Sequence, residues 1–398
     1  MAEGSDDQKE GSEWKYWGKS RSGTREVVCY GCGEKGHTKR NCPSLVRSKP
    51  TGGYSGSKKI IICYYCQDEG HVQTNCPVKF AEQESLQEAG NGQILNPPFC
   101  QGKGKGADKA ESLYLTTLVD LTCLIKEETH YIDTHCHLEY VFERHHIIIS
   151  ENAFKEFMIA NQYPNGFDGC ISTFCDPTAF SSLGSFDQIL KDPKVWATFG
   201  IHPHNSKYYT ETLKAKLCEA LIHPKCIALG EIGLDYSNVS PSDRETQVRI
   251  LKDQLQLALQ YNKPVQIHCR QAENELKSIL LEELPKDWRI HLHCYTGQAP
   301  TAVGLIATFP NLYIGITGSI TVKRLPQVRE TASLIPLERI LLETDAPYMI
   351  PTDLKDKLKF SHPIMILHVA ERIAKIKDIA LNEVLCTTRR NTKKMYDI

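Results

Sequence analysis

The chain has 398 residues, 41% of them hydrophobic, which is enough to bury a large core. This length predicts two or three domains, or one barrel with accessory segments. The 47 basic and 48 acidic residues nearly cancel, so the formal net charge of −1 indicates no class of partner. The sequence has neither a basic start followed by an apolar run nor an apolar run long enough to span a bilayer. We therefore expect a nuclear or cytoplasmic protein that is not secreted and has no membrane partner. Its oligomeric state is not indicated by the sequence, and we expect a monomer.

Two short segments with identical cysteine and histidine spacing lie within residues 23–80. They follow residues 1–22, which we predict to be disordered because they are mostly Gly, Ser, Lys and acidic residues. Three thiolates and one imidazole complete the tetrahedral shell of a structural Zn²⁺, and the bound ion would supply the folding energy that such a short segment lacks. We therefore predict two structural Zn²⁺ ions, one in each segment, held by Cys29, Cys32, His37 and Cys42 and by Cys63, Cys66, His71 and Cys76.

Both segments resemble zinc knuckles of the retroviral type. The resemblance implies binding of single-stranded nucleic acid, with bases stacked on ring side chains. The candidate contacts are the rings of Tyr30 and Tyr64 and the basic side chains of Lys39 and Arg40. The second knuckle has residues 67–69 (Gln-Asp-Glu) where the first has Gly-Glu-Lys, so it is the weaker candidate. A structural or protein-binding role for the pair stays open. Residues 81–126 are predicted to be a linker, whose apolar end could pack against the next domain.

From residue 127 a repeating pattern begins, in which a short apolar strand is followed by polar residues and then by a helical pattern. One such helix is expected at residues 243–261, where Leu251, Leu255 and Ala258 recur at helical spacing. Eight units of this kind over residues 127–398 predict a closed (β/α)8 TIM barrel. An open doubly wound sheet is the alternative, but no Gly-x-Gly-x-x-Gly follows the first strand. The predicted strands cover residues 131–138, 168–174, 195–202, 226–233, 264–269, 289–294, 311–317 and 339–345.

Four histidines and two carboxylates stand at the ends of these strands. His135 and His137 are two positions apart on a strand, so their rings share a face. The active sites of barrels are built on the carboxyl ends of the strands. A cluster of this kind on one rim would be a large uncompensated polar group without a cation, so we predict a metal site. Its predicted ligands are His135, His137, Glu231, His268, His293 and Asp345.

These residues lie in six motifs, which run in the order Asp133-Thr-His-Cys-His137, Gly200-Ile-His-Pro-His204, Gly230-Glu-Ile-Gly-Leu-Asp235, Ile267-His-Cys-Arg270, His293-Cys-Tyr-Thr-Gly297 and Glu343-Thr-Asp-Ala-Pro-Tyr348. The order resembles the TatD family of metal-dependent hydrolases, within the amidohydrolase superfamily. The resemblance implies two divalent ions, Mg²⁺ or Mn²⁺ with Zn²⁺ as a further option. One would be held by His135, His137 and Asp345 and the other by His268 and His293, with Glu231 bridging. It also implies removal of nucleotides from a 3′ end. After Tyr348 the usual Arg-Asn loop is replaced by Lys359-Phe-Ser-His-Pro363, as in a eukaryotic branch of the family.

The predicted chemistry is hydrolysis of a phosphodiester in single-stranded DNA or RNA. A pair of cations activates water and stabilises the charge that develops at phosphorus. Asp345 is placed to accept the proton of the attacking water. Arg270 and His202 are candidates to contact a non-bridging phosphate oxygen, the alternatives being a salt bridge on the rim for Arg270 and a supporting role for His202. Asp235 could orient a ligand histidine, and His204 and His362 are weaker candidates. The alternative function is an amidohydrolase-type enzyme acting on a small amide, ester or phosphoester, because a fold does not fix its substrate.

Overall fold

The structure is a computed structural model that describes residues 121–180, 185–238 and 240–398. The predicted disordered start, both knuckles and the predicted linker up to residue 120 therefore lie outside the described residues. Eight parallel strands form one sheet in the order β1 to β8. Their bounds are β1 Tyr131–Cys136, β2 Phe167–Phe174, β3 Val195–Phe199, β4 Cys226–Asp235, β5 Val265–Arg270, β6 Ile290–Leu292, β7 Leu312–Ile316 and β8 Ile340–Leu342.

The sheet closes where the chain beyond β8 meets the end of β1. The backbone N–H of Asp345 donates to the carbonyl of His135 at 2.9 Å, and the N–H of His137 donates to the carbonyl of Ala346 at 2.7 Å. The hydroxyl of Thr134 also donates to the carbonyl of Leu342 at 2.9 Å. The predicted (β/α)8 barrel is therefore confirmed, and the doubly wound alternative is wrong. All eight predicted strands are present, although β1 ends at Cys136, one residue before His137. Strands β3, β6 and β8 are also shorter than predicted, and β4 runs on to Asp235.

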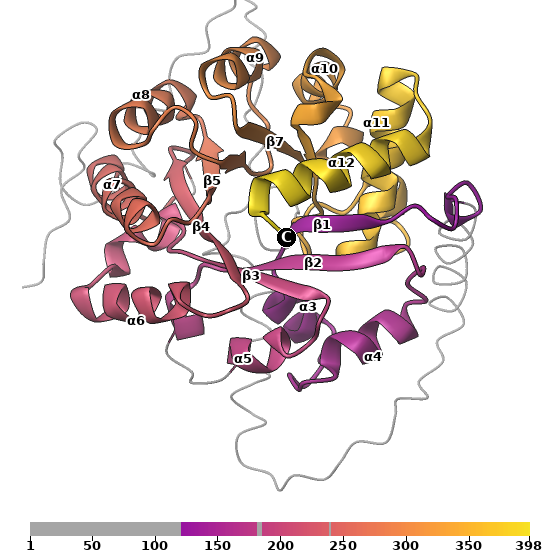
Figure 1. Ribbon diagram of the computed structural model, residues 1–398, viewed down its shortest axis with the longest axis horizontal. Coiled ribbons are helices and arrows are strands. Elements are labelled where there is room, and N and C mark those ends of the chain that lie inside the picture. The colour runs from indigo at the N-terminus through magenta and orange to yellow at the C-terminus, as the bar shows by residue number, and fades with distance from the viewer. Residues whose placement is uncertain (1–120, 181–184, 239) are drawn as a thin grey trace, which may run out of the picture. The chain divides into compact units, whose positions relative to one another are not determined.

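Helices surround the barrel on its outer side (Figure 1). The helix predicted at residues 243–261 is α7, which begins after Asp243 because that carboxylate accepts a hydrogen bond from the N–H of Thr246 at 2.9 Å. Its buried face carries Ile250, Leu251 and Leu255. The helices are α3 Leu138–Arg144, α4 Ala153–Ala160, α5 Ser185–Leu190, α6 Glu211–Leu221, α7 Arg244–Gln260, α8 Glu273–Glu283, α9 Ala299–Thr308, α10 Pro326–Leu334, α11 Ile366–Lys377 and α12 Leu381–Tyr396.

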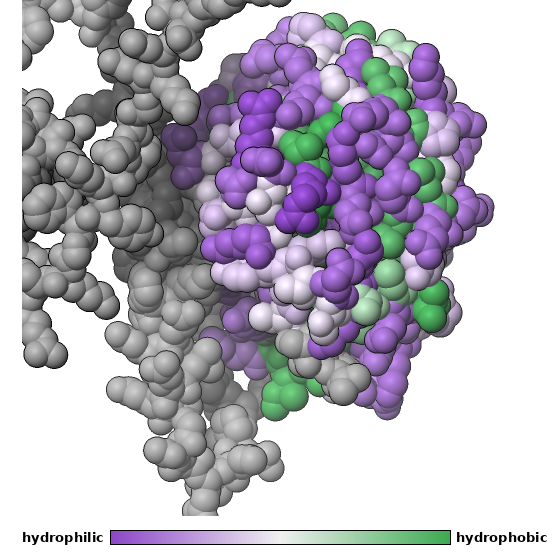
Figure 2. Space-filling model, turned by 90° about the vertical axis from the view of Figure 1, so that its left-hand side faces the viewer, coloured by the Kyte–Doolittle hydropathy of each residue, from purple (hydrophilic) through white to green (hydrophobic). Residues whose placement is uncertain are grey.

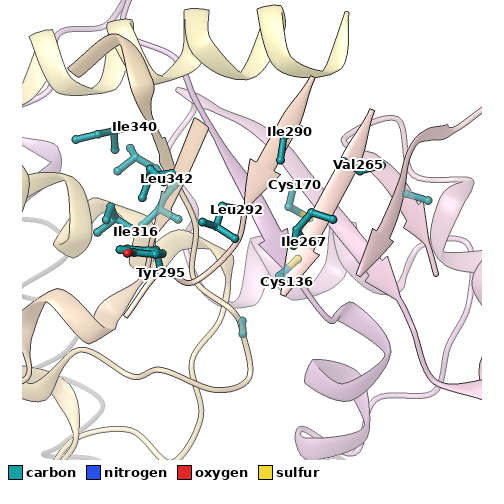
Figure 3. Packing of buried hydrophobic residues seen from close by; sticks show 14 of the residues in the cluster. Cys136, Cys170, Val265, Ile267, Ile290, Leu292, Tyr295, Ile316, Ile340 and Leu342 are labelled. Carbon is teal, nitrogen blue, oxygen red and sulfur yellow. The ribbon is translucent and has the colours of Figure 1, made fainter. Parts of the chain in front are cut away.

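Alternation along the strands separates the apolar packing from the polar interior. On β5 and β6 the side chains of Val265, Ile267, Ile290 and Leu292 belong to the main apolar cluster (Figure 3). The residues between them are polar and buried, and successive side chains of a strand point to opposite faces. Polar side chains therefore line the inside of the barrel, ahead of the histidines at the strand ends.

The last helix, α12, closes the structure against β1 and β8. Its Met395 and Tyr396 pack in a second apolar cluster with residues of β2, β4, β7 and β8. Near its start, Asn382 accepts a hydrogen bond from the N–H of Lys126 at 2.9 Å, which anchors the end of the predicted linker. The face of the barrel in Figure 2 is mostly hydrophilic with scattered hydrophobic residues, as expected of a surface facing water. Within the described residues no helix is both long and apolar enough to cross a membrane.

Candidate metal centre

The first group of candidate ligands forms at the seam of the barrel. The Nε2 atoms of His135 and His137 lie 3.2 Å apart, and each is 3.5 Å from Oδ1 of Asp345. All three side chains are buried. The Nδ1 of His137 lies 3.0 Å from the carbonyl of Thr173, so Nδ1 carries the proton and the lone pair of Nε2 faces the group. The backbone of Asp345 has a left-handed φ of 55°, and its N–H donates to the carbonyl of His135. This backbone conformation sets the position of the Asp345 carboxylate. This trio can hold one cation.

Glu231 on β4 lies at the centre of the whole cluster. Its Oε2 is 3.8 Å from His135 Nε2 and 3.9 Å from His137 Nε2. Its Oε1 is 2.8 Å from His268 Nδ1, 3.6 Å from His202 Nε2 and 3.6 Å from His293 Nε2. The two oxygens of one buried carboxylate thus face two different sets of imidazoles. This is the arrangement that a carboxylate bridging two cations requires.

The second group contains one residue that the predicted ligand set left out. His268 and Glu231 form a candidate cation site with His202, whereas His293 is grouped with Glu231 and His135. The ring of His268 lies 4.6 Å from the ring of His202 and 6.4 Å from that of His293. The pairing of His268 with His293 on one ion therefore stays a prediction, and His202 is a further candidate ligand.

One buried atom in the cluster points to a missing positive partner. Among the described residues, Oδ1 of Asp345 is buried and makes no hydrogen bond. A buried polar atom without a partner costs free energy, on the order of 1–3 kcal/mol. Nitrogen and oxygen donors in one dry pocket suit a divalent cation. The residues present therefore fit the predicted pair of ions.

The electrostatics keep the carboxylates of Glu231 and Asp235 ionised. Burial by itself raises the pKa of Glu231, but His202, His293 and His268 hold that pKa well below its ordinary value. Burial likewise opposes the ionisation of Asp235, and its hydrogen bonds with His204 and His268 lower its pKa. Anionic oxygens are what a cation needs as ligands, so both carboxylates are ready to coordinate a cation or to orient its ligands.

Asp235 has the position expected of a residue that orients a ligand. Its Oδ2 lies 3.2 Å from Nε2 of His268 and 2.8 Å from Nε2 of His204. His204 is thus tied to the cluster through Asp235. His362 lies outside the cluster, where its Nδ1 is 2.9 Å from the hydroxyl of Tyr163. Arg270 is not among the grouped ligands but lines a cavity beside them.

Glu343 and His291 support the candidate ligand His293, and the predicted site did not include them. Oε2 of Glu343 lies 3.2 Å from Nδ1 of His293 and 2.9 Å from Nε2 of His291. A Cβ at Gly315 on β7 would lie 2.4 Å from the Glu343 carboxylate, so this position requires a glycine. His291 stands two residues before His293 on β6, and that spacing was the signal that could have identified it.

Tyr396 of α12 contacts His291 inside the barrel. The hydroxyl of Tyr396 lies 2.6 Å from Nδ1 of His291 and accepts a hydrogen bond from the amide of Gln266 at 3.1 Å. Tyr396, His291, Glu343 and His293 therefore form a continuous polar chain from α12 to the candidate metal centre. No local sequence signal marks Tyr396, because only the packing of α12 brings it there.

A closed (β/α)8 barrel with this set of histidines and carboxylates at the carboxyl ends of its strands defines the class of metal-dependent hydrolases. The chain belongs to the TatD-related DNase family, whose model matches residues 132–397. The zinc knuckle model matches residues 27–44 and 61–78.

Relatives with known names agree with this assignment. The chain is 39% identical over 274 residues to the human 3'-5' RNA nuclease TATDN2, an alignment that covers 68% of this chain and 36% of that protein. It is 36% identical over 212 residues to the 3'-5' ssDNA/RNA exonuclease TatD of Escherichia fergusonii, covering 52% of this chain and 79% of the relative. The chain thus spans little more than a third of the human protein.

Solved structures give the same fold. The TatD homologue YjjV of Escherichia coli superposes with a TM-score of 0.58 at 25% identity, covering 67% of this chain and 98% of that chain. A TatD family hydrolase of Entamoeba histolytica superposes with a TM-score of 0.57 at 25% identity, again over 67% of this chain and 98% of that chain.

Proposed function

We propose that this chain is a divalent-metal-dependent nuclease that hydrolyses phosphodiester bonds of single-stranded RNA or DNA and removes nucleotides from the 3′ end. Mg²⁺ or Mn²⁺ is the proposed pair of ions in the barrel, with Zn²⁺ as a further option. The observation that carries the proposal is the position of Glu231, whose two oxygens face separate sets of buried imidazoles within 3.9 Å. Family membership and the names of the relatives support the same reaction class.

The proposed ligands divide as the cluster does. His135, His137 and Asp345 would hold one ion, and His268 with His293 or His202 the other, with Glu231 between them. When bound, the ions supply activation of water and polarisation of a phosphoryl oxygen. Asp345 then accepts the proton of the attacking water, since its carboxylate is fixed at the edge of the cluster by the backbone bond to His135.

Two further side chains are proposed to contact the scissile phosphate. Arg270 stands two residues beyond His268 on the same strand face, so its guanidinium can donate to a non-bridging oxygen. His202 could do the same if it does not bind a cation, because its Nε2 faces the cluster. Both contacts would stabilise charge that grows in the transition state.

The two segments that match the zinc knuckle model are proposed to bind the strand before it reaches the barrel. Each would hold one structural Zn²⁺, and the contacts would be made by Tyr30, Tyr64, Lys39 and Arg40. A linker between two modules that bind one polymer raises the local concentration of that polymer at the second module. We also propose a nuclear or cytoplasmic location, in keeping with nine free cysteines among the described residues. A monomer is proposed as well.

The test compares single-stranded RNA and DNA 20-mers labelled at either end, incubated with Mg²⁺ or Mn²⁺. We expect a 3′ label to appear at once as a mononucleotide and a 5′ label to appear in a descending ladder. Glu231→Gln should abolish both, whereas Glu151→Gln, at an exposed glutamate, should leave both unchanged. Absence of metal-dependent nucleotide release, together with hydrolysis of a small ester or amide, would favour the amidohydrolase alternative.

A further inference from the structure

A cavity of about 540 Å³ lies at the carboxyl end of the barrel. Its walls come from the segments that follow β5, β6, β7 and β8, with Gln271, Thr296, Arg324 and Met349 as one example from each. This volume is within the range of pockets that hold small molecules. The cavity therefore has room for a ligand the size of a nucleotide.

Arg270 joins this cavity to the candidate metal centre. It lines the cavity and stands two residues beyond His268, so both side chains point to the same face of β5. A ligand in the cavity would therefore adjoin a phosphate held at the metal centre.

Hydrogen bonds between the loops hold the cavity walls in place. The N–H of Thr352 donates to the hydroxyl of Thr321 at 2.8 Å, which ties the segment after β8 to the segment after β7. The guanidinium of Arg329 donates to the carbonyls of Val322 at 2.8 Å and Lys323 at 3.0 Å. The amide of Gln327 donates to the carbonyl of Thr296 at 3.2 Å. These bonds hold the backbone just before Arg324 and tie the neighbouring segments together, so this wall of the cavity is ordered.

The lining suits an anionic ligand that also has an apolar face. Arg270, Arg324 and Lys355 contribute three cations, whereas Glu273 is the one carboxylate among the lining residues. Val322, Leu325 and Met349 supply apolar surface, and no aromatic ring lines the cavity. Phosphates pair with Arg and Lys, and the flat face of a base can pack on aliphatic side chains.

We propose that this cavity binds the nucleotide next to the scissile phosphate. Arg324 and Lys355 would then bind the phosphate on the other side of that nucleotide, the next one along the strand. The inference rests on the proposed nuclease function and adds to it a second phosphate site. A substrate with a phosphate beyond the scissile one gains an ion pair there, whereas a bare dinucleoside monophosphate does not.

The experiment uses the full chain with Mn²⁺ and three dinucleotides: one with no terminal phosphate, one with a 5′ phosphate and one with a 3′ phosphate. We expect one of the two phosphorylated dinucleotides to have a KM about tenfold lower than the bare one, the size expected of a charge-assisted contact. In Arg324→Ala/Lys355→Ala this difference should vanish while kcat is kept. The matched control Lys323→Ala/Lys359→Ala removes two exposed cations that do not line the cavity, and it should keep the difference.

The outcomes separate this site from the function on which it rests. If neither the dinucleotides nor longer strands release nucleotides, the proposed nuclease function fails. If the strands are cleaved but a terminal phosphate does not change KM, the cavity proposal is overturned and the nuclease stands. The cavity proposal is likewise overturned if the tenfold difference survives in Arg324→Ala/Lys355→Ala.

Discussion

The backbone N–H of Asp345 donates a hydrogen bond to the carbonyl of His135 at 2.9 Å. This bond joins the segment after the last strand to the first strand, and it places the Asp345 carboxylate 3.5 Å from the Nε2 of His135. The contact that closes the barrel therefore also brings together the residues of the first cation site. The carboxylate is positioned by the backbone and does not depend on a flexible side chain for its location.

Asp345→Asn should lower kcat for single-stranded RNA by about 10²- to 10⁴-fold, because the amide keeps the shape but cannot accept a proton. We expect a smaller change in KM. Steady-state kinetics with a labelled 20-mer measure both constants. Asp353→Asn, at an exposed aspartate paired with Arg372, is the control and should behave as the unmodified protein. Equal kcat values for Asp345→Asn and the control would exclude Asp345 as the base.

Glu343→Gln should lower the affinity of the candidate metal centre for Mn²⁺, although Glu343 is not a proposed ligand. The carboxylate contacts His293 and His291, and such partners of a ligand typically contribute 10- to 100-fold to metal affinity. We therefore expect about that loss in Mn²⁺ affinity, measured by calorimetry on the metal-free protein. Unchanged affinity would mean that Glu343 supports only the fold.

Tyr396→Phe should destabilise the barrel by roughly 1–3 kcal/mol, since the buried amide of Gln266 and the ring of His291 lose a partner. Tyr131→Phe is a matched control, because the hydroxyl of Tyr131 is buried without a hydrogen-bond partner among the described residues. Its removal should be neutral or stabilising. Urea unfolding of both variants tests the pair. Equal stabilities would show that the polar chain from α12 contributes no free energy.

Acid should destabilise the barrel partly through His362. Burial, reinforced by His145 and His368, lowers the pKa of His362 to about 3, whereas an unfolded histidine has a pKa near 6.5. The unfolded state therefore binds more protons, so this contribution is complete above pH 6.5 and is lost as pH falls toward 3. Between pH 7 and pH 5 the loss should be about 2 kcal/mol.

Replacing the histidine isolates this contribution. In His362→Phe the difference in unfolding free energy between pH 7 and pH 5 should shrink by that amount. The His362 ring lies outside the metal cluster, so metal binding should not change the result. An identical pH dependence in the two proteins would contradict the expected pKa.

The knuckles can be tested by removing their rings. Tyr30→Ala/Tyr64→Ala should lower affinity for a 40-mer RNA by about tenfold or more, because stacking contributes about 1–3 kcal/mol per base. Hydrolysis of a dinucleotide should be unchanged. Tyr54→Ala, between the knuckles, is the control. Fluorescence anisotropy measures the affinities, and full retention of RNA binding would assign the knuckles a structural or protein-binding role.

Local periodicity was enough to predict the strands, and the motifs at their ends were enough to select the candidate ligands. The local geometry differs from the prediction, because β1 ends at Cys136, before His137, and Glu231 lies within β4 and not at its end. Contacts between distant segments could not be predicted in the same way. The approach of His202 to Glu231 depends on how the chain turns after β3, and the insertion of Tyr396 depends on the packing of α12. The cavity is built by four loops whose spacing no single segment encodes.

The central claim is that side chains on five strands, or just after their ends, hold two cations with Glu231 between them. Anomalous diffraction from crystals grown with Mn²⁺ tests it most directly. We expect two manganese peaks, one beside His135, His137 and Asp345 and the other beside His268, with either His293 or His202 as its next ligand. A single peak, or peaks away from Glu231, would contradict the proposed metal centre.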